Sequence, residues 1–300
     1  MPAASPSDPA LFALTLMEME GVGRVTAGRL LRHFATYDEL VRYPREQVLA
    51  RVKGAPNAAD LVKRLFDREA MHTRLAGAGT AIEALRAKHV VLFSMRGPHW
   101  PEGLDALPRA HRPVLLYGYG DREALARPAV ALLARPPITD AAFDVAQSLV
   151  RTLAAHGIAP ATGAGHGFDV VMHKRAASGP EPSPSLLVAP CGLARLPAVM
   201  RPIASAAVRA GGLLLSPFPM THGPYEHDDR ERALVLAALA RAAVFFEPRA
   251  DAPEWGALEW ALEAGKPVFG VEDPDHPMPA RVHRLHTDVD FEWILAALRA

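Results

Sequence analysis

The spacing of apolar residues divides the chain into two parts with different periods. Up to about residue 75, apolar side chains recur every three or four positions, as at Leu11 and Leu14 or Leu30 and Phe34, which is typical of amphipathic helices. Prolines and glycines interrupt this pattern, so it predicts several short helices, the last over 58–75. The Ala-Gly-Ala-Gly-Thr stretch at 76–80 is expected to end this helical domain, which gives a first domain over residues 1–80.

Beyond residue 80, short unbroken apolar runs alternate with helical stretches. The expected strands are 89–94, 114–117, 129–133, 186–189, 213–215, 243–247 and 267–271. The expected helices are 141–156, 168–178, 198–210, 229–241 and 255–265. Because unbroken hydrophobic strands need cover on both faces, the pattern predicts an α/β domain over 81–300 with a mostly parallel sheet. Ligands of such sheets bind at the carboxyl ends of the strands.

Composition narrows the possible functions. Of the 300 residues, 33 are Lys or Arg and 33 are Asp or Glu, so a polyanion would have to be held by a local patch and not by net charge. The lone cysteine, Cys191, excludes a disulfide framework and any multi-cysteine metal site, and we expect it to be an inert buried residue. No long apolar run could span a membrane, and no secretory signal is visible at the start. These features predict a soluble, cytoplasmic protein with no membrane partner.

The strongest local motif is a glycine-rich turn between a strand and a helix. It comprises Gly163, Gly165 and Gly167 with His166 between the last two, and a helix with Asp169, His173, Lys174 and Arg175 follows. Amide hydrogens in such a turn can approach a phosphate, and the helix dipole favours negative charge there. The spacing matches neither a Walker loop nor the dinucleotide fingerprint. On spacing alone, phosphate binding and a plain tight turn are about equally supported.

Two further segments could carry charge to the same edge of the sheet. The run Asp228–Arg232 begins a helix, and Arg230 or Arg232 could face an anionic ligand, although such runs are more often exposed and internally paired. Glu247-Pro248-Arg249 ends a strand and is a third candidate.

The sequence offers little support for catalysis or for a metal site. The histidines lack the H-x-x-x-H and H-E-x-x-H spacings of zinc sites, so no metal and no cofactor is predicted. Asp169 and His173 lie four residues apart on one helix and more often form a structural hydrogen bond or cap than an acid–base couple. We therefore expect the protein not to be an enzyme.

A tight turn also occurs in the helical domain. Met19-Glu20-Gly21-Val22-Gly23-Arg24 is similar to the hairpin of a helix-hairpin-helix unit, whose amides can meet a DNA phosphate. The basic and acidic residues of this domain are nearly balanced, and such a bundle is at least as often a packing or docking module.

The order of these segments resembles the DNA-processing protein A (DprA/Smf) family. Residues 162–173 are similar to the family motif S-G-x-A-x-G-I-D-x-x-A-H. Residues 100–120 resemble its Y-P-x-x-L … P-x-x-L-Y-x-x-G, and 265–269 its closing G-R-x-V-F. Two other family motifs are matched only in part: V-G-S-R at Arg135, and R-N-R at Arg230-Glu231-Arg232. The chain leaves no room for the winged-helix domain that many members carry at the carboxyl end.

The resemblance implies both architecture and function. It implies a helix-hairpin-helix or SAM-like domain followed by an extended Rossmann-like domain, and a homodimer. It also implies a single-stranded DNA-binding accessory protein of recombination and natural transformation that helps to load a RecA-type recombinase. The DNA- or phosphate-binding residues expected on this basis are Gly163, Gly165, His166, Gly167, Asp169, His173, Lys174, Arg175, Arg230, Arg232 and Arg135.

Two alternatives remain open from the residues themselves. The glycine turn could hold a nucleotide or a phosphorylated metabolite, as in a sensor or a hydrolase. The chain could also be a degenerate paralogue that acts through protein contacts, for example with RecA or with an intact family member.

Overall fold

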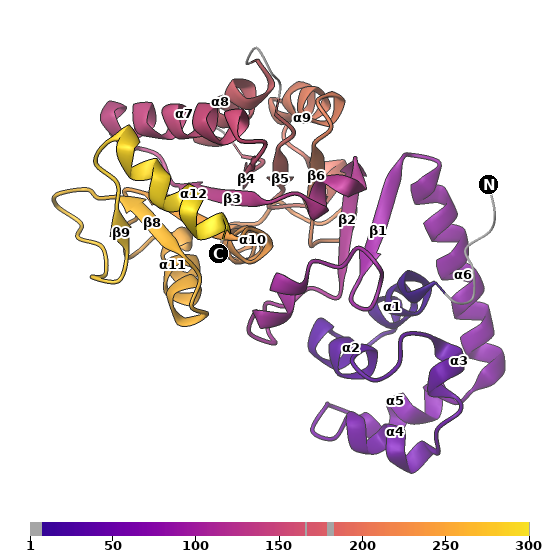
Figure 1. Cartoon of the computed structure of the whole chain (residues 1–300). Helices are drawn as coiled ribbons and strands as arrows, with labels where there is room; N and C mark the ends of the chain where they lie inside the picture. The colour runs from indigo at the N-terminus through magenta and orange to yellow at the C-terminus, as the bar shows by residue number, and fades with distance from the viewer. Residues whose placement is uncertain (1–7, 166, 179–182, 300) are drawn as a thin grey trace. The chain divides into compact units, whose positions relative to one another are not determined.

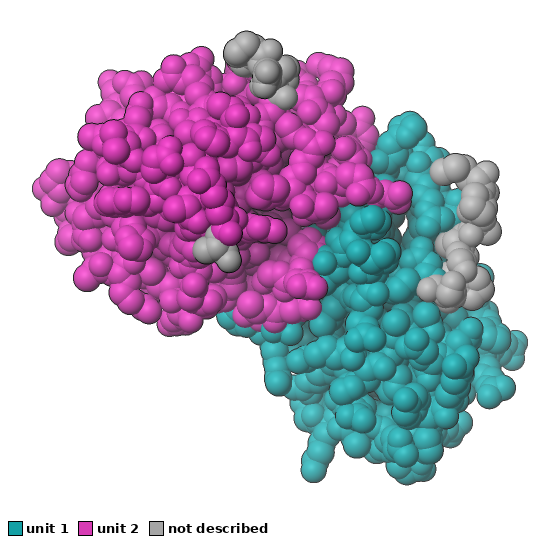
Figure 2. Space-filling view, in the orientation of Figure 1, with its two compact units in different colours: residues 1–100, 108–116 teal, residues 101–107, 117–300 magenta. Residues whose placement is uncertain are grey.

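A computed structural model of the chain describes residues 8–165, 167–178 and 183–299. The chain separates into two compact units, coloured differently in Figure 2. Unit 1 comprises residues 1–100 and 108–116, and unit 2 comprises residues 101–107 and 117–300.

Unit 1 is built mainly of helices around one apolar core. Its elements are α1 (Pro9–Glu18), α2 (Arg24–Leu31), α3 (Tyr37–Leu40), α4 (Arg45–Arg51), α5 (Ala58–Leu65), α6 (Arg68–Arg86) and the strand β1 (Val90–Ser94). The fully buried side chains of Phe12, Leu30 and Leu65 lie in this core. The turn that joins α1 to α2 contains Gly21 with φ of +75°, a left-handed conformation that glycine adopts without strain.

The last helices of unit 1 differ from the expected pattern. The predicted helix over 58–75 is two helices, because the chain breaks at Phe66 and Asp67, and the Asp67 side chain accepts the amide hydrogen of Ala70 as a new N-cap. The second of them, α6, then continues through Gly77 and Gly79 to Arg86. Gly77 and Gly79 were expected to end the helix, but the good helix-forming residues around them let it continue.

Unit 2 contains a mostly parallel sheet (Figure 1). Its strands are β2 (Leu115–Gly120), whose first two residues belong to unit 1, β3 (Ala129–Ala134), β4 (Ala159–Gly163), β5 (Leu186–Val188), β6 (Leu213–Ser216), β7 (Ala242–Phe246), β8 (Val268–Val271) and β9 (His283–Arg284). They lie in the order β2-β6-β5-β4-β3-β7-β8-β9. The pairs from β6 to β9 are parallel, and β2 runs antiparallel to β6. The predicted α/β class and Rossmann-like arrangement are confirmed.

Helices cover both faces of this sheet, as Figure 1 shows. On one face lie α7 (Asp140–Ala155), α8 (Phe168–Ala177), α9 (Met200–Arg209) and α12 (Phe291–Arg299). On the other lie α10 (Asp228–Leu239) and α11 (Pro253–Glu263), and α10 crosses β3, β4 and β5. The buried residues Leu132, Phe168 and Phe246 show how strand and helix side chains share one core. Within the described residues, no helix is long and apolar enough to cross a membrane.

Candidate functional site

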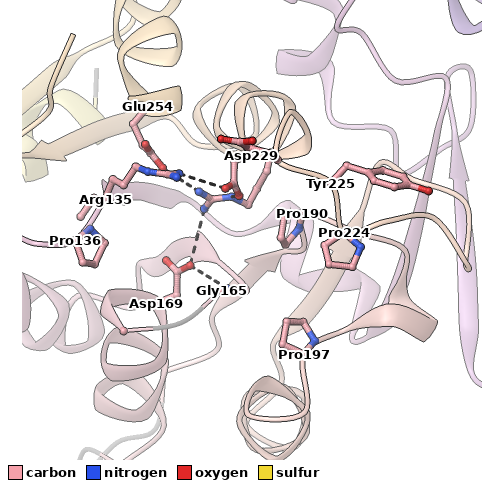
Figure 3. A pocket seen from close by; sticks show the side chains of 14 residues that line it. Arg135, Pro136, Gly165, Asp169, Pro190, Pro197, Pro224, Tyr225, Asp229 and Glu254 are labelled. Atoms are coloured by element: carbon pink, nitrogen blue, oxygen red, sulfur yellow. Dashed lines mark hydrogen bonds and ion pairs between the residues drawn. The ribbon is translucent and has the colours of Figure 1, made fainter. Parts of the chain in front are cut away.

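A cleft of about 570 Å³ lies at the carboxyl ends of β3, β4 and β5. Figure 3 shows its lining: Arg135 and Pro136 follow β3, Gly165 and Asp169 follow β4, and Pro190 follows β5. Asp229 of α10 and Glu254 of α11 reach the cleft from the other face of the sheet. The carboxyl edge of the sheet, where a ligand was expected, therefore holds a cavity.

The glycine-rich turn closes around the Asp169 side chain. The Asp169 carboxylate accepts hydrogen bonds from Thr162 Oγ1 at 2.5 Å, from the Gly163 amide at 3.2 Å and from the Gly165 amide at 3.0 Å. Asp169 is only 8% exposed. This differs from the prediction that these two amides meet a phosphate, because a carboxylate of the same chain already takes their hydrogens.

Two of the glycines are required by the geometry of the turn. A Cβ atom on Gly163 would lie 2.1 Å from Nη1 of Arg232 and 2.4 Å from Asp169 Oδ2, so no side chain fits there. Gly167 is the N-cap of α8 and has φ of +64°, which a side chain would strain. His166, also predicted as a ligand, lies outside the described residues.

Arg232 stands at the centre of the cleft and is surrounded by carboxylates. Its Nη2 donates to Glu254 Oε1 at 2.9 Å, its Nε lies 3.4 Å from Asp229 Oδ1, and its Nη1 lies 3.9 Å from Asp169 Oδ2. Burial would lower the pKa of Arg232, but Asp169, Glu254 and Asp229 outweigh burial and raise it. The arginine is therefore an ion-paired support of the cleft floor.

The remaining charges at the cleft are also paired or acidic. Arg135 lies 3.2 Å from Asp229 Oδ2 and is partly exposed. Burial raises the pKa of Glu254, although Arg232 opposes this. With Glu226 at the lining as well, four carboxylates outnumber two arginines, so the cleft has no cationic excess to attract a phosphate.

His173 has a structural role beneath the turn. It is buried, its Nε2 lies 2.9 Å from the Gly163 carbonyl oxygen, and its Nδ1 lies 3.2 Å from Ser185 Oγ. Because a carbonyl only accepts, Nε2 carries the proton and Nδ1 accepts from Ser185. Burial lowers the pKa of His173 and so favours this neutral ring. His173 and Asp169 thus both hold the turn, each through its own partners.

The other predicted cations lie away from the cleft lining. Lys174 is exposed and borders a separate apolar groove between α8 and α9, and Arg175 follows it on α8. Arg230 is exposed beside Gly256 of α11. Of the predicted positive side chains, the structure therefore brings only Arg135 and Arg232 into the cleft.

A row of aromatic rings borders the cleft and was missed from the sequence, apart from Tyr225. The rings of Phe218 and His222 stack at 4.6 Å, Tyr225 meets His222 edge-on, and Tyr225 and His227 lie parallel at 5.6 Å. Tyr225 is 57% exposed, and the His227 side chain is 80% exposed. The buried Asp228 carboxylate orders this segment, because it accepts from His222 Nε2 and from the Tyr225 amide.

Other candidates from the sequence are structural. The Glu247 carboxylate accepts from the amide and hydroxyl of Thr139 and so fixes the residue that caps α7, since Thr139 Oγ1 accepts from the Ala142 amide. Cys191 is buried, as expected, and burial raises the pKa of its thiol to about 11, which disfavours the reactive thiolate. Among the described residues, no group of His, Cys, Asp and Glu is arranged to hold a metal ion.

Comparisons with known proteins identify relatives of this chain. The chain is 26% identical to a DNA processing protein DprA of Mycobacterium tuberculosis over 268 residues, which cover 81% of this chain and 67% of the relative. The structure of Streptococcus pneumoniae DNA processing protein A matches with a TM-score of 0.69 at 16% identity, over 97% of this chain and 98% of that one. The Helicobacter pylori protein, described for its single-stranded DNA binding mode, matches with a TM-score of 0.58 at 19% identity, over 68% and 95%.

The two solved structures share the fold of this chain. Residues 91–289 match the family model of DNA recombination-mediator protein A, which assigns a role in DNA processing and recombination. The chain belongs to the DNA recombination-mediator protein A family.

Proposed function

We propose that this protein is a non-catalytic, single-stranded DNA-binding accessory protein of recombination that acts in the cytoplasm. The observation that carries the proposal is the exposed parallel pair of Tyr225 and His227 beside the cleft at the carboxyl edge of the sheet. Proteins that bind single-stranded DNA combine such stacking platforms with cations that follow the backbone. The family role in recombination supports DNA as the polymer.

In this proposal the phosphates of the DNA backbone lie outside the cleft. Its lining is acidic and the glycine amides are occupied by Asp169, so a phosphate has little reason to enter. The guanidinium of Arg135, at the end of β3, is partly exposed at the cleft lining, and that of Arg230, in the first turn of α10, is exposed outside the lining. The backbone would follow these two arginines while one or more bases stack on Tyr225.

The test is the affinity for a fluorescein-labelled single-stranded oligonucleotide at low and high salt. Tyr225→Ala should weaken binding by roughly 1–3 kcal/mol if one base stacks there. Arg230→Ala should weaken binding and also flatten its salt dependence, because fewer counterions are released. Tyr43→Ala is the matched control, since Tyr43 is a similarly exposed tyrosine on unit 1.

Two results would overturn this proposal. One is the absence of oligonucleotide binding at low salt, and the other is an affinity that Tyr225→Ala and Arg230→Ala leave unchanged.

We also propose a homodimer and a RecA-type recombinase as protein partners. The recombination-mediator family supports the recombinase. Val289 and Trp293, near the carboxyl end, are 77% and 53% exposed, and this apolar surface would suit a second copy. Light scattering of the purified protein and of Trp293→Glu tests the dimer, and co-purification with RecA tests the recombinase.

A free nucleotide is the second candidate ligand. A cavity of about 570 Å³ is in the range of small-molecule sites. A thermal-shift panel of nucleotides separates the two functions, because a tight ligand raises the Tm by mass action.

A further inference from the structure

The cleft offers hydrogen-bond acceptors to a ligand and few donors. The turn amides of Gly163 and Gly165 are taken by Asp169, and the guanidinium of Arg232 is held by three carboxylates. Apart from Arg135, whose Nη1 pairs with Asp229, the charged groups that remain at the lining are carboxylates. A ligand that fits this chemistry must bring N–H donors.

Glu254 supplies a buried acceptor that the fold does not use. Its side chain is 97% buried and lines the cleft floor, with Oε1 bonded to Arg232. Within the described residues, its Oε2 has no hydrogen-bond partner. Figure 3 shows the Glu254 carboxyl directed at the centre of the cleft. A buried carboxylate oxygen without a donor costs free energy that a donor from a ligand would recover.

Glu226 supplies a second acceptor at the edge of the cleft. It follows Tyr225, is exposed and lines the cavity. Across the ranges that the structure describes, no hydrogen bond or ion pair ties its carboxylate to another group. Both oxygens are thus available to receive two donors at once.

The walls between these acceptors suit a flat ring. Pro136, Pro190, Pro197 and Pro224 line the cavity with apolar surface, and Tyr225 lies beside Pro224 (Figure 3). Enzymes and binding proteins hold an extruded base in such a way, between apolar or aromatic side chains with hydrogen bonds to its pairing edge.

We propose that the cleft binds a nucleobase edge that presents two adjacent N–H donors, as guanine does with N1–H and N2–H₂. This inference rests on the proposed function and adds a base preference to it. The Glu226 carboxylate accepts the two donors in a bidentate pair, the proline walls and Tyr225 enclose the ring, and Glu254 lies at the floor for a further donor.

The donor pattern separates guanine from the other bases. Adenine and cytosine each place an amino donor next to a ring acceptor, and thymine places its single N–H between two carbonyl acceptors. Those acceptors would face a carboxylate and repel it. A carboxylate accepting two parallel N–H groups is the stronger arrangement, as in arginine–carboxylate pairs.

The experiment compares three fluorescein-labelled single strands of equal length: oligo-dT, alternating dG and dT, and alternating dI and dT. Hypoxanthine in dI keeps N1–H and lacks the 2-amino group. The dG/dT strand should bind about tenfold more tightly than oligo-dT because the bidentate contact discriminates between bases, and the dI/dT strand should lie between them. Glu226→Gln should bring the three affinities close together.

Matched variants keep the result interpretable. Glu263→Gln removes an exposed carboxylate of α11 outside the cleft lining and should leave the dG preference unchanged. Glu254→Gln should reduce the preference, but it also alters the partner of Arg232, so its fold is checked by circular dichroism. Because Glu226 is exposed, Glu226→Gln should fold normally.

The outcomes distinguish this inference from the proposed function. Equal affinity for all three strands overturns the base preference and leaves single-stranded DNA binding intact. A preference that survives in Glu226→Gln also overturns the inference. If no strand binds but guanosine raises the Tm more than thymidine does, the base site stands and the DNA function fails. If neither nucleoside nor strand binds, both fail.

Discussion

Nη2 of Arg232 donates a 2.9 Å hydrogen bond to Oε1 of Glu254, 22 residues further along the chain. Asp169 and Asp229 form ion pairs with the same guanidinium. One ion-pair cluster therefore links α8, α10 and α11. Replacing Arg232 with Ala should lower the free energy of unfolding by about 3–5 kcal/mol, because the buried Asp169 and Glu254 carboxylates lose the cation that lies between them. Urea unfolding measures this loss.

Arg230→Ala is the control for that experiment. Arg230 lies two residues earlier on the same helix and is exposed, so its removal should change stability by less than about 0.5 kcal/mol. Weaker DNA binding together with lower stability in Arg232→Ala would report on folding, whereas weaker binding at unchanged stability in Arg230→Ala would report on a DNA contact. Equal stability of Arg232→Ala and the wild type would show that the buried ion pairs contribute nothing net.

Two glycine substitutions should act in opposite directions. Gly163→Ala places a Cβ atom 2.1 Å from Nη1 of Arg232, so the network must shift, and we expect a loss of roughly 1–3 kcal/mol. Gly77→Ala lies on the exposed face of α6, with open space around the new methyl, and should gain about 0.5–1 kcal/mol. Thermal unfolding of both variants gives the signs, and a destabilised Gly77→Ala would contradict the helix assignment there.

The architecture was largely predictable because apolar runs such as 243–247 are too hydrophobic to lie anywhere except inside a covered sheet. A strand before the glycine turn was expected, but the bounds of β4 were not predicted, since Ala159-Pro160-Ala161 lacks the β-branched residues that mark a strand. The two-residue β9 and the helix α12 were also missed.

The cleft was harder to predict than the sheet. Asp169, Arg232 and Glu254 come from three separated segments, so no sequence spacing reveals their pairing. It follows from the packing of α10 against β3 to β5 and of α11 against α10. The glycine turn indicated where backbone amides lie close together. That the Asp169 carboxylate accepts their hydrogen bonds could be inferred only weakly, from an aspartate in the first turn of the following helix.

Acid should destabilise the protein through His173. Burial lowers the pKa of this histidine in the folded state below its usual value of 6.5. The unfolded chain therefore takes up a proton first, and stability should fall as pH drops below about 6.5. His173→Gln keeps a donor for the Gly163 carbonyl but does not titrate, so the difference in stability between variant and wild type should change with pH over this range. A constant difference would exclude His173 as the titrating group.

Lys266 should add a second rise of stability with pH, on the alkaline side. Its ammonium donates to the carbonyls of Ala237 at 2.9 Å, Ala238 at 3.0 Å and Ala240 at 2.5 Å, which are carbonyls at the end of α10 that lack helical partners. Burial lowers its pKa from 10.5 to about 8. Between these two values the unfolded chain holds the proton and the folded chain does not, so this group makes stability rise with pH.

Lys266→Met tests both parts of that argument. It leaves the α10 carbonyls without their donor, and stability at pH 7 should fall by about 1–3 kcal/mol. It should also abolish the rise above pH 8, whereas Lys63→Met, at an exposed position of α5, should keep both the stability and the rise. If Lys266→Met loses stability but retains the rise, the three carbonyl bonds hold the ammonium charged through this range, and another group titrates near pH 8.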